Sequence, residues 1–315
     1  MKGARYEVYR NAFTLPSSDK IHTLAAWCWT PERPVGVIQL SHGMCEYVLR
    51  YEKFAERMCD AGFAVVGHDH LGHGHTARNA DELGYITDAK DPALCLVKDV
   101  YAVNGWIKKT FPELPIILYG HSMGSFIARW ALTEYKDAWN AAVISGTAGP
   151  EAPTGAGKLL CRVLGLFGKR SRSNLLYTIA FGSYDKPFAS EGIKNAWLTR
   201  DRAVIEKYNA DPFCNYRFTV NGYLTLFTLL GYVSAKDWAK KMPLDLPMLI
   251  VSGENDPVGN FGKGVRHVEA RLRDAGASEL SSMYFEGMRH EPHNEADNDN
   301  FYEGVINTMH RMIKR

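Results

Sequence analysis

Short apolar runs alternate with stretches of helical spacing, and this alternation constrains the fold more than any other feature of the sequence. The runs that we interpret as buried strands are residues 35–40, 63–66, 115–119, 141–145, 247–252 and 280–285. The helical stretches are residues 47–61, 92–111, 122–135, 263–275 and 296–314. Because parallel strands need a crossover connection, usually a helix, the pattern predicts an α/β fold. We expect a mostly parallel central sheet with helices on both of its faces.

Two segments depart from this rhythm. Residues 6–15 and 21–29 alternate polar and apolar side chains around the turn Pro16-Ser-Ser-Asp19, which predicts an opening β-hairpin. Residues 150–244 have helical stretches but no clear buried strand. We therefore expect one core domain, residues 1–149 and 245–315, interrupted by a helical lid at residues 150–244.

Composition excludes several classes of protein. The chain has 37 Lys and Arg against 35 Asp and Glu, so no nucleic-acid partner is expected. No apolar run reaches membrane-spanning length, and no signal peptide is visible. The six cysteines lack C-x-x-C spacing, which favours free thiols in a reducing compartment. We expect a cytoplasmic protein, and its oligomeric state stays open.

A G-x-S-x-G motif, Gly120-His-Ser-Met-Gly124, lies between an apolar run and a helical stretch. A sharp strand-to-helix turn holds a serine exposed in this context, and glycines two residues before and after it prevent collisions. The amino end of the following helix also favours negative charge near the serine. We predict Ser122 as a nucleophile and expect the adjacent His121 to pack beneath the turn.

The first strand of the predicted parallel sheet ends in Ser41-His-Gly-Met-Cys45, at the same sheet edge as Ser122. A tetrahedral intermediate needs two N–H donors that already point at its oxygen. We predict that these oxyanion donors are the amides of Met44 and Met123. Gly43 and Cys45 are expected to contact the substrate.

Acidic residues and histidines follow the last two predicted strands. Glu254 and Asp256 come after the run at 247–252, and His290 and His293 follow the run at 280–285. An aspartate at a strand end can orient an imidazole, which then takes the proton of the serine. We predict Asp256 and His290 for these roles, with Glu254 and His293 as the competing residues.

These residues belong to longer signatures. They are Ser41-His-Gly-Met-Cys-Glu-Tyr47 with Arg50-Tyr51, Gly67-His-Asp-His-Leu-Gly-His-Gly74, Gly120-His-Ser-Met-Gly124, Ser252-Gly-Glu-Asn-Asp-Pro257 and Gly287-Met-Arg-His-Glu291. With them the sequence resembles the monoacylglycerol lipase and lysophospholipase group of α/β-hydrolases, which is also filed with serine aminopeptidase-like (S33-type) hydrolases. The resemblance implies a lidded fold that hydrolyses lipid-like esters through an acyl-enzyme, without a cofactor. The chain order Ser122, Asp256, His290 is typical of this architecture.

Other functions remain open at this stage. The chain could be a short-chain carboxylesterase, or an aminopeptidase or amidase of the same fold. An aminopeptidase needs an acidic subsite for the substrate amine, which Glu191 or Asp185 of the lid could supply. A binding protein on a disabled hydrolase scaffold is a further alternative, and the three filled positions argue against it.

Two segments of the lid carry hypotheses about the substrate. Residues 221–233 hold no charge, so we expect them to line an acyl pocket, with Leu226 and Leu229 as contacts. Residues 158–167 are amphipathic and lead into the basic Lys169-Arg-Ser-Arg172, which indicates either contact with a lipid surface or packing of the lid on the core. The histidines of residues 67–75 are interpreted as a structural loop, and no metal is expected.

Overall fold

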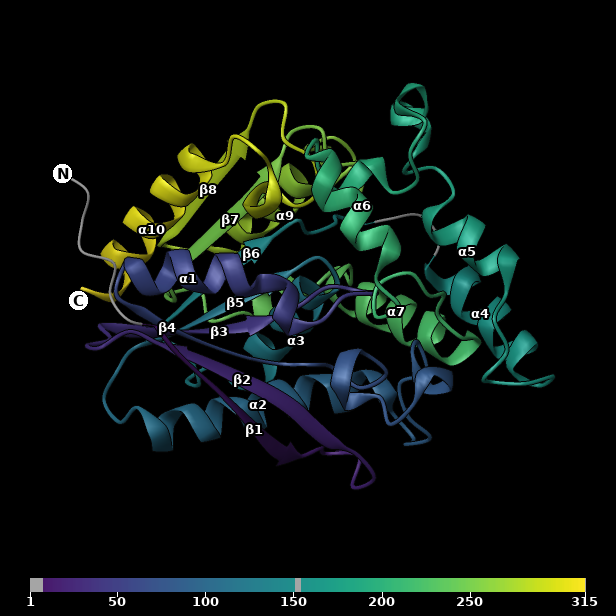
Figure 1. The fold of residues 1–315 in the computed structure, drawn as a ribbon, viewed down its shortest axis with the longest axis horizontal. Coiled ribbons are helices and arrows are strands. Elements are labelled where there is room, and N and C mark those ends of the chain that lie inside the picture. Colours follow the sequence, from purple (N-terminus) through teal and green to yellow (C-terminus); the bar gives the residue numbers. More distant parts are fainter. Residues whose placement is uncertain (1–7, 151–153, 315) are drawn as a thin grey trace.

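The computed structural model describes residues 8–150 and 154–314 and has the predicted α/β architecture (Figure 1). Eight strands form one sheet in the order β1-β2-β4-β3-β5-β6-β7-β8. They are Tyr9–Pro16 (β1), Thr23–Thr30 (β2), Gly36–Ser41 (β3), Phe63–His68 (β4), Ile116–His121 (β5), Ala141–Ser145 (β6), Met248–Gly253 (β7) and Leu280–Phe285 (β8). The hairpin β1–β2 and its junction with β4 are antiparallel, whereas all pairs from β4 to β8 are parallel.

Helices cover both faces of the sheet, as predicted. One face carries α1 (Glu52–Asp60) and α10 (Asp299–Ile313), and the other carries α2 (Pro92–Thr110), α3 (Met123–Glu134) and α9 (Lys263–Ala275). Successive residues of a strand enter opposite cores, so that Leu118 of β5 packs toward α2 and α3 while Tyr119 packs toward α1 and α10. Because both faces are buried, the central strands are continuous apolar runs, which made them readable from the sequence.

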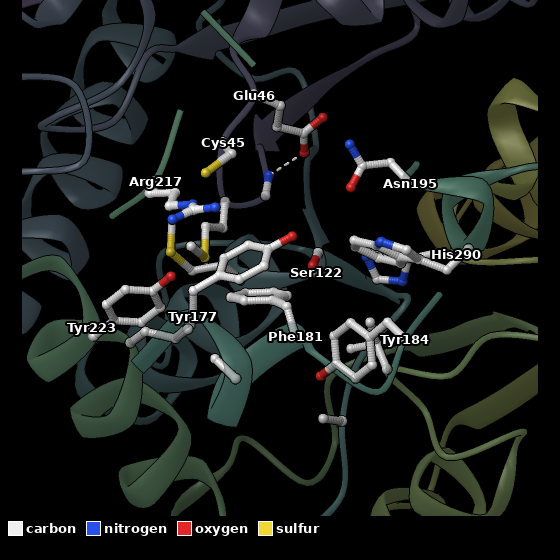
Figure 2. A pocket seen from close by; sticks show the side chains of 18 of the residues that line it. Cys45, Glu46, Ser122, Tyr177, Phe181, Tyr184, Asn195, Arg217, Tyr223 and His290 are labelled. Carbon is white, nitrogen blue, oxygen red and sulfur yellow. Dashed lines mark hydrogen bonds between the residues drawn. The ribbon is translucent and has the colours of Figure 1, made fainter. Parts of the chain in front are cut away.

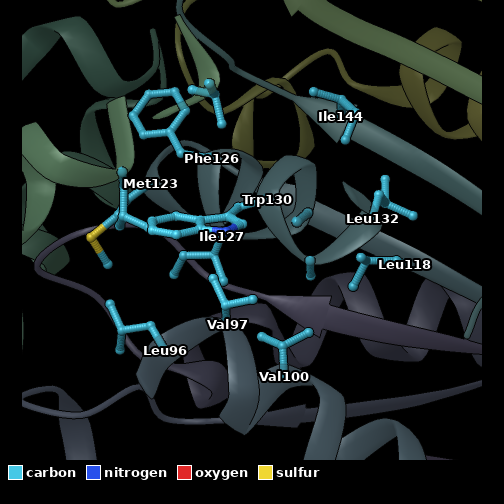
Figure 3. Packing of buried hydrophobic residues seen from close by; sticks show 14 of the residues in the cluster. Leu96, Val97, Val100, Leu118, Met123, Phe126, Ile127, Trp130, Leu132 and Ile144 are labelled. Carbon is cyan, nitrogen blue, oxygen red and sulfur yellow. The ribbon is translucent and has the colours of Figure 1, made fainter. Parts of the chain in front are cut away.

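The core between α2 and α3 fixes the carboxyl edge of the sheet (Figure 3). The side chains that interlock there are Met123, Phe126, Ile127 and Trp130 of α3, Leu96, Val97 and Val100 of α2, Leu118 of β5 and Ile144 of β6. Helix α2 is itself anchored at its start, where the Asp91 side chain accepts a hydrogen bond from the amide of Leu94 at 3.0 Å. The amino end of α3 is therefore held firmly against the ends of the strands.

Between β6 and β7 the described residues form helices and contain no strand, and we refer to this segment as the insertion. Its helices are Thr154–Gly165 (α4), Asn174–Phe181 (α5), Arg202–Ala210 (α6), Val220–Val233 (α7) and Trp238–Lys241 (α8), with short 3-10 helices at Lys186–Glu191 and Ala196–Leu198. The insertion lies beyond the carboxyl ends of the strands (Figure 1), and α7 packs against both α3 and α4. None of the helices described is long and apolar enough to cross a membrane.

One predicted helix is broken in the structure. Residues 47–61 form a 3-10 helix, Val48–Tyr51, followed by α1, because Tyr51 leaves the helical conformation and the amide of Val48 donates to Asp69 at 2.8 Å. Other short 3-10 helices are Gly74–Thr76, Ala80–Glu82 and Pro292–Asn294. The first residues of the predicted hairpin, 6 and 7, lie outside the described residues.

Candidate active site

Ser122 occupies a tight turn between β5 and α3. Its backbone has φ 54° and ψ −123°, a conformation that side chains other than glycine rarely adopt, and its amide donates to the Ser145 carbonyl at 3.0 Å. A Cβ atom on Gly124 would lie 2.0 Å from the Ser41 carbonyl oxygen, and one on Gly120 would lie 2.6 Å from the Gly124 oxygen. The two glycines of the motif are therefore required by the close approach of backbone to backbone.

His290 and Asp256 form a buried pair on the loops after β8 and β7. The imidazole Nδ1 lies 2.9 Å from Asp256 Oδ2, and Asp256 Oδ1 accepts a hydrogen bond from the Val258 amide at 2.9 Å. A carboxylate at Nδ1 makes that nitrogen the donor and leaves Nε2 as the basic nitrogen. His290 and Ser122 line the same cavity (Figure 2).

The pKa of His290 is raised above its usual value. Burial by itself would lower it, but the charge of Asp256 and its hydrogen bond outweigh burial, and the carboxylates of Glu291 and Glu46 act in the same direction. The site thus stabilises the imidazolium that forms when His290 takes up a proton.

The competing residues have other partners. Glu254 is half-exposed and accepts a hydrogen bond from Arg266 at 2.9 Å. His293 is stacked on Tyr51 with ring centroids 5.0 Å apart, and burial lowers its pKa to about 4. His121 is buried, and its Nδ1 lies 3.4 Å from the Ser145 hydroxyl. Of these candidates, the structure brings only His290 to Asp256.

The two residues predicted as oxyanion donors are Met44, on the loop after β3, and Met123, the first residue of α3. Met44 and Met123 both line the cavity, and neither amide has an acceptor within residues 8–150 and 154–314. The Gly43 amide, by contrast, already donates to the Glu46 carboxylate. Cys45 also lines the cavity with a left-handed backbone, φ 55°, and burial raises the pKa of its thiol. The amide of Met44 therefore lies next to the cavity without an acceptor among the described residues.

The cavity has a volume of about 510 Å³ and lies between the sheet edge and the insertion. Of the residues predicted to contact the substrate, Gly43, Cys45 and Leu226 line the cavity and Leu229 does not. Leu229 is fully buried in the core, and the next residue, Leu230, lines the cavity instead. Because α7 packs against α3 and α4, the helix has one face for the core and another for the cavity.

Aromatic residues of the insertion form much of the wall and were not predicted. Tyr177 and Phe181 of α5, the following Tyr184, and Trp197 all line the cavity, and the first three are labelled in Figure 2. Their spacing of four and three residues is a helical face that could have been noticed. Spacing alone does not tell which way such a face points.

The histidine-rich loop is a structural element. His42 Nε2 accepts a hydrogen bond from the His70 amide at 2.9 Å, and the Ser41 hydroxyl lies 3.0 Å from His70 Nε2. Asp69 accepts hydrogen bonds from the amides of Val48 and His75. Within the described parts of the chain, no group of three or more His, Cys, Asp and Glu side chains is placed to hold a metal ion. These contacts tie the loops after β3 and β4 together behind the site.

Comparison with known sequences gives consistent matches. A family model described as serine aminopeptidase, S33, matches residues 32–297. A monoacylglycerol lipase of Mycolicibacterium smegmatis is 29% identical over 273 residues, which cover 85% of this chain and 86% of that protein. The monoglyceride lipase of Homo sapiens is 27% identical over 260 residues, which cover 78% of this chain and 76% of that protein.

Solved structures share the whole architecture. A thermostable carboxyl esterase from Bacillus coagulans, crystallised with glycerol, matches with a TM-score of 0.89 and 27% identity, covering 98% of this chain and 100% of that chain. A lipase in an open form matches in fold with a TM-score of 0.88 and 24% identity, covering the same shares of both chains.

Proposed function

This chain belongs to the serine aminopeptidase S33 family of hydrolases, and we propose that it cleaves carboxylic esters of monoacyl lipids through an acyl-enzyme intermediate. One observation carries the proposal. Ser122, on its strained turn, and His290, which is paired with the buried Asp256, line the same largely apolar cavity. No cofactor enters this chemistry.

We infer the following reaction from these residues. Ser122 Oγ attacks the ester carbonyl while His290 Nε2 takes the hydroxyl proton, and Asp256 holds the imidazole in the required tautomer. The amides of Met44 and Met123 stabilise the oxyanion. The protonated His290 then gives its proton to the departing alcohol. Water, activated by the same histidine, releases the fatty acid and restores Ser122.

The cavity fits a single acyl chain. Its wall is mostly aliphatic and aromatic, with Phe126 from the core and Leu226, Phe227 and Leu230 from the insertion. Ligand sites of this kind bind apolar groups by burying them and use few polar contacts for orientation. The two lipase relatives are named for activity on monoacylglycerols, which carry one acyl chain.

The structure gives little support to an aminopeptidase. Glu191 pairs with Arg289, and a carboxylate oxygen of Asp185 accepts a hydrogen bond from the Asn195 amide at 3.0 Å. Neither acidic residue lines the cavity. The lid carboxylates that a substrate amine would need therefore have other roles.

A second substrate class, lysophospholipids, is favoured by two cations. Lys194 and Arg217 line the cavity and are exposed, and neither has an acidic partner among the residues described. The remaining non-histidine charged lining residues, Glu46, Arg50 and Glu291, pair with one another. The unpaired cations suit a phosphate-bearing substrate. Replacing both by glutamine should reduce hydrolysis of lysophospholipids more than that of monoacylglycerols.

We also propose that the insertion acts as a lid that touches lipid. The exposed Leu159 and Val163 lie four residues apart on one face of α4, and Leu166 and Phe167, just after the helix, are 83% and 87% exposed. The exposed basic segment Lys169–Arg172 follows directly. An apolar stripe beside positive charge is the surface that binds anionic lipid aggregates.

The cysteines suit a reducing compartment. All six are buried and free, with no disulfide to stabilise the fold. We propose the cytoplasm as the location, and cell fractionation tests it.

An active-site probe tests the proposed function directly. A fluorophosphonate should label the wild type and not Ser122→Ala, whereas the exposed control Ser278→Ala should be labelled normally. A panel of p-nitrophenyl esters of graded length, monoacylglycerols, lysophospholipids and aminoacyl amides then ranks the substrates. Equal labelling of Ser122→Ala would exclude the proposed nucleophile, and a preference for short soluble esters would exclude the lipid assignment.

A further inference from the structure

Three charged side chains are buried behind the cavity. Arg50 donates to Glu46 at 2.6 Å and, through both terminal nitrogens, to the two carboxylate oxygens of Glu291 at 3.0 Å each. Their side chains are only 11%, 3% and 2% exposed, in the order Arg50, Glu46, Glu291. Burying ions is costly, and apolar residues of similar volume often give equal or greater stability. Stability alone therefore does not account for this cluster.

Within the cluster, Glu46 contacts the oxyanion loop, the segment after β3 that contains Gly43 and Met44. Glu46 Oε1 accepts hydrogen bonds from the Gly43 amide and, at 2.8 Å, from the Tyr51 hydroxyl. A Cβ on Gly43 would lie 2.6 Å from that same oxygen and 3.0 Å from the Cβ of Ser122. Glu46 thus holds Gly43 close against Ser122, and the next amide along the chain is that of Met44.

Glu291, in contrast, links the cluster to the insertion and to the histidine loop, the segment after β8 that contains His290. Glu291 directly follows His290, its amide donates to the Leu198 carbonyl of the insertion at 2.8 Å, and Asn294 donates to its carboxylate at 2.8 Å. The Arg50 guanidinium also lies 4.8 Å from the ring centroid of Tyr208 in α6. One side chain therefore contacts the oxyanion loop, the histidine loop and the insertion.

We propose that Arg50 is a positioning residue, which holds Glu46 and Glu291 so that the Met44 amide and His290 stay in fixed positions relative to Ser122. This inference rests on the proposed function, because it assigns Arg50 to the same reaction. A misplacement of about 1 Å at a reacting group costs on the order of 100-fold in rate. Arg50 suits the task because its planar group binds two carboxylates at once, which a lysine ammonium does not.

The charge of the cluster also acts on His290. The titratable groups around the imidazole are Asp256, His121 from β5, His293 and Glu291 from its own loop, and Glu46 with Arg50 from the opposite loop. Burial lowers the pKa values of His121 and His293, which makes them neutral at pH 7. Burial also acts on Glu291, but Arg50 outweighs it and lowers the pKa of Glu291 to about 2. Ionised Glu291 therefore raises the pKa of His290, as Asp256 does.

Three variants test the proposal. Arg50→Lys keeps the positive charge but loses the planar guanidinium group that binds both carboxylates. Glu291→Gln keeps the shape of the side chain but loses its negative charge. Arg57→Lys is the matched control, because Arg57 also pairs with a carboxylate, Asp299 at 2.7 Å, and its guanidinium lies 4.8 Å from a tyrosine ring. Unlike Arg50, its side chain is 47% exposed, and Arg57 does not line the cavity. For each variant, kcat and KM are measured against pH on a soluble p-nitrophenyl ester. The concentration of active sites used to calculate kcat comes from labelling with a fluorophosphonate. The thermal unfolding midpoint is the third readout.

We expect Arg50→Lys to lower kcat by about 10- to 100-fold with an unchanged acid limb of the pH profile. Glu291→Gln should lower kcat and also move the acid limb to lower pH, because His290 loses a nearby negative charge. In both variants KM should change by less than about threefold, since ground-state contacts are retained. Arg57→Lys should match the wild type in every kinetic readout.

The outcomes separate the two proposals. Wild-type kcat per labelled site and a wild-type pH profile in both cluster variants would overturn the positioning role and leave the proposed function intact. A lowered unfolding midpoint without a kinetic change would overturn it in the same way. A wild type that is neither labelled nor active on any ester overturns the proposed function, and this inference with it. If Arg50→Lys does not fold, the isosteric Glu291→Gln decides by its kcat and its acid limb.

Discussion

The sheet edge around Ser122 and the helical insertion above it differ in what determines their residues. At the sheet edge, backbone atoms approach so closely that Gly120 and Gly124 leave no space for a side chain. In the insertion, α4 and the turn after it expose Leu166 and Phe167 to solvent, where no contact within the protein demands an apolar residue. The comparison shows that close internal packing determines the residues at the sheet edge, whereas the exposed residues of the insertion are under no such constraint. The predictions below test this division.

The largest effect is expected at the sheet edge. Asp256→Asn should lower kcat by about 10⁴-fold, because an amide at Nδ1 favours the wrong tautomer of His290. Glu254→Gln, two residues away and paired with Arg266 at the surface, should retain full activity. Steady-state kinetics on a soluble ester measure both. A loss of less than tenfold in Asp256→Asn would place the acid elsewhere.

Glycine substitutions should show how tightly the sheet edge is packed. Gly124→Ala places a methyl group 2.0 Å from the Ser41 carbonyl oxygen, so the free energy of unfolding should fall by about 1–3 kcal/mol or more. Gly105→Ala, in α2 with no atom within 4 Å of the added carbon, should instead raise it by up to about 1 kcal/mol. Urea denaturation gives both values. Equal effects would refute the steric explanation of the motif.

The insertion should behave in the opposite manner. Leu166→Asp combined with Phe167→Asp should reduce hydrolysis of aggregated long-chain substrates by about tenfold, since a charge opposes contact with lipid. Activity on a soluble short ester and the unfolding midpoint should not change, because both side chains are largely exposed. Ile21→Asp, at a half-exposed position near the hairpin turn, is the control. Parallel losses on both substrates would argue for a structural role of the stripe.

The smallest effect concerns pH. His290 acts as a base only when it is neutral, and its pKa is raised mainly by Asp256 against the effect of burial. As the pH is lowered, kcat/KM should therefore fall around the pKa of His290, which lies above the usual histidine pKa of 6.5. The pH profile of kcat/KM on a soluble ester checks this. An acid limb below 6.5 would contradict the raised pKa.

The sequence predicted the sheet edge in detail because local rules apply there. Strands buried on both faces are apolar throughout, and the turn at Ser122 has a strict glycine requirement. Helix α7 was harder, since a segment without charge has no polar face to show which of Leu229 and Leu230 faces the cavity. The pair of Arg50 and Glu291 joins residues 241 positions apart, and no periodicity in a single sequence reports such a contact.

The strained turn at Ser122 has a consequence for which substitutions stabilise the protein. Its left-handed backbone, φ 54°, costs on the order of 1–3 kcal/mol for a residue with a side chain, and glycine would adopt it with far less strain. Ser122→Gly should thus yield an inactive protein that is more stable than the wild type. Mutation toward stability alone therefore favours losing the serine.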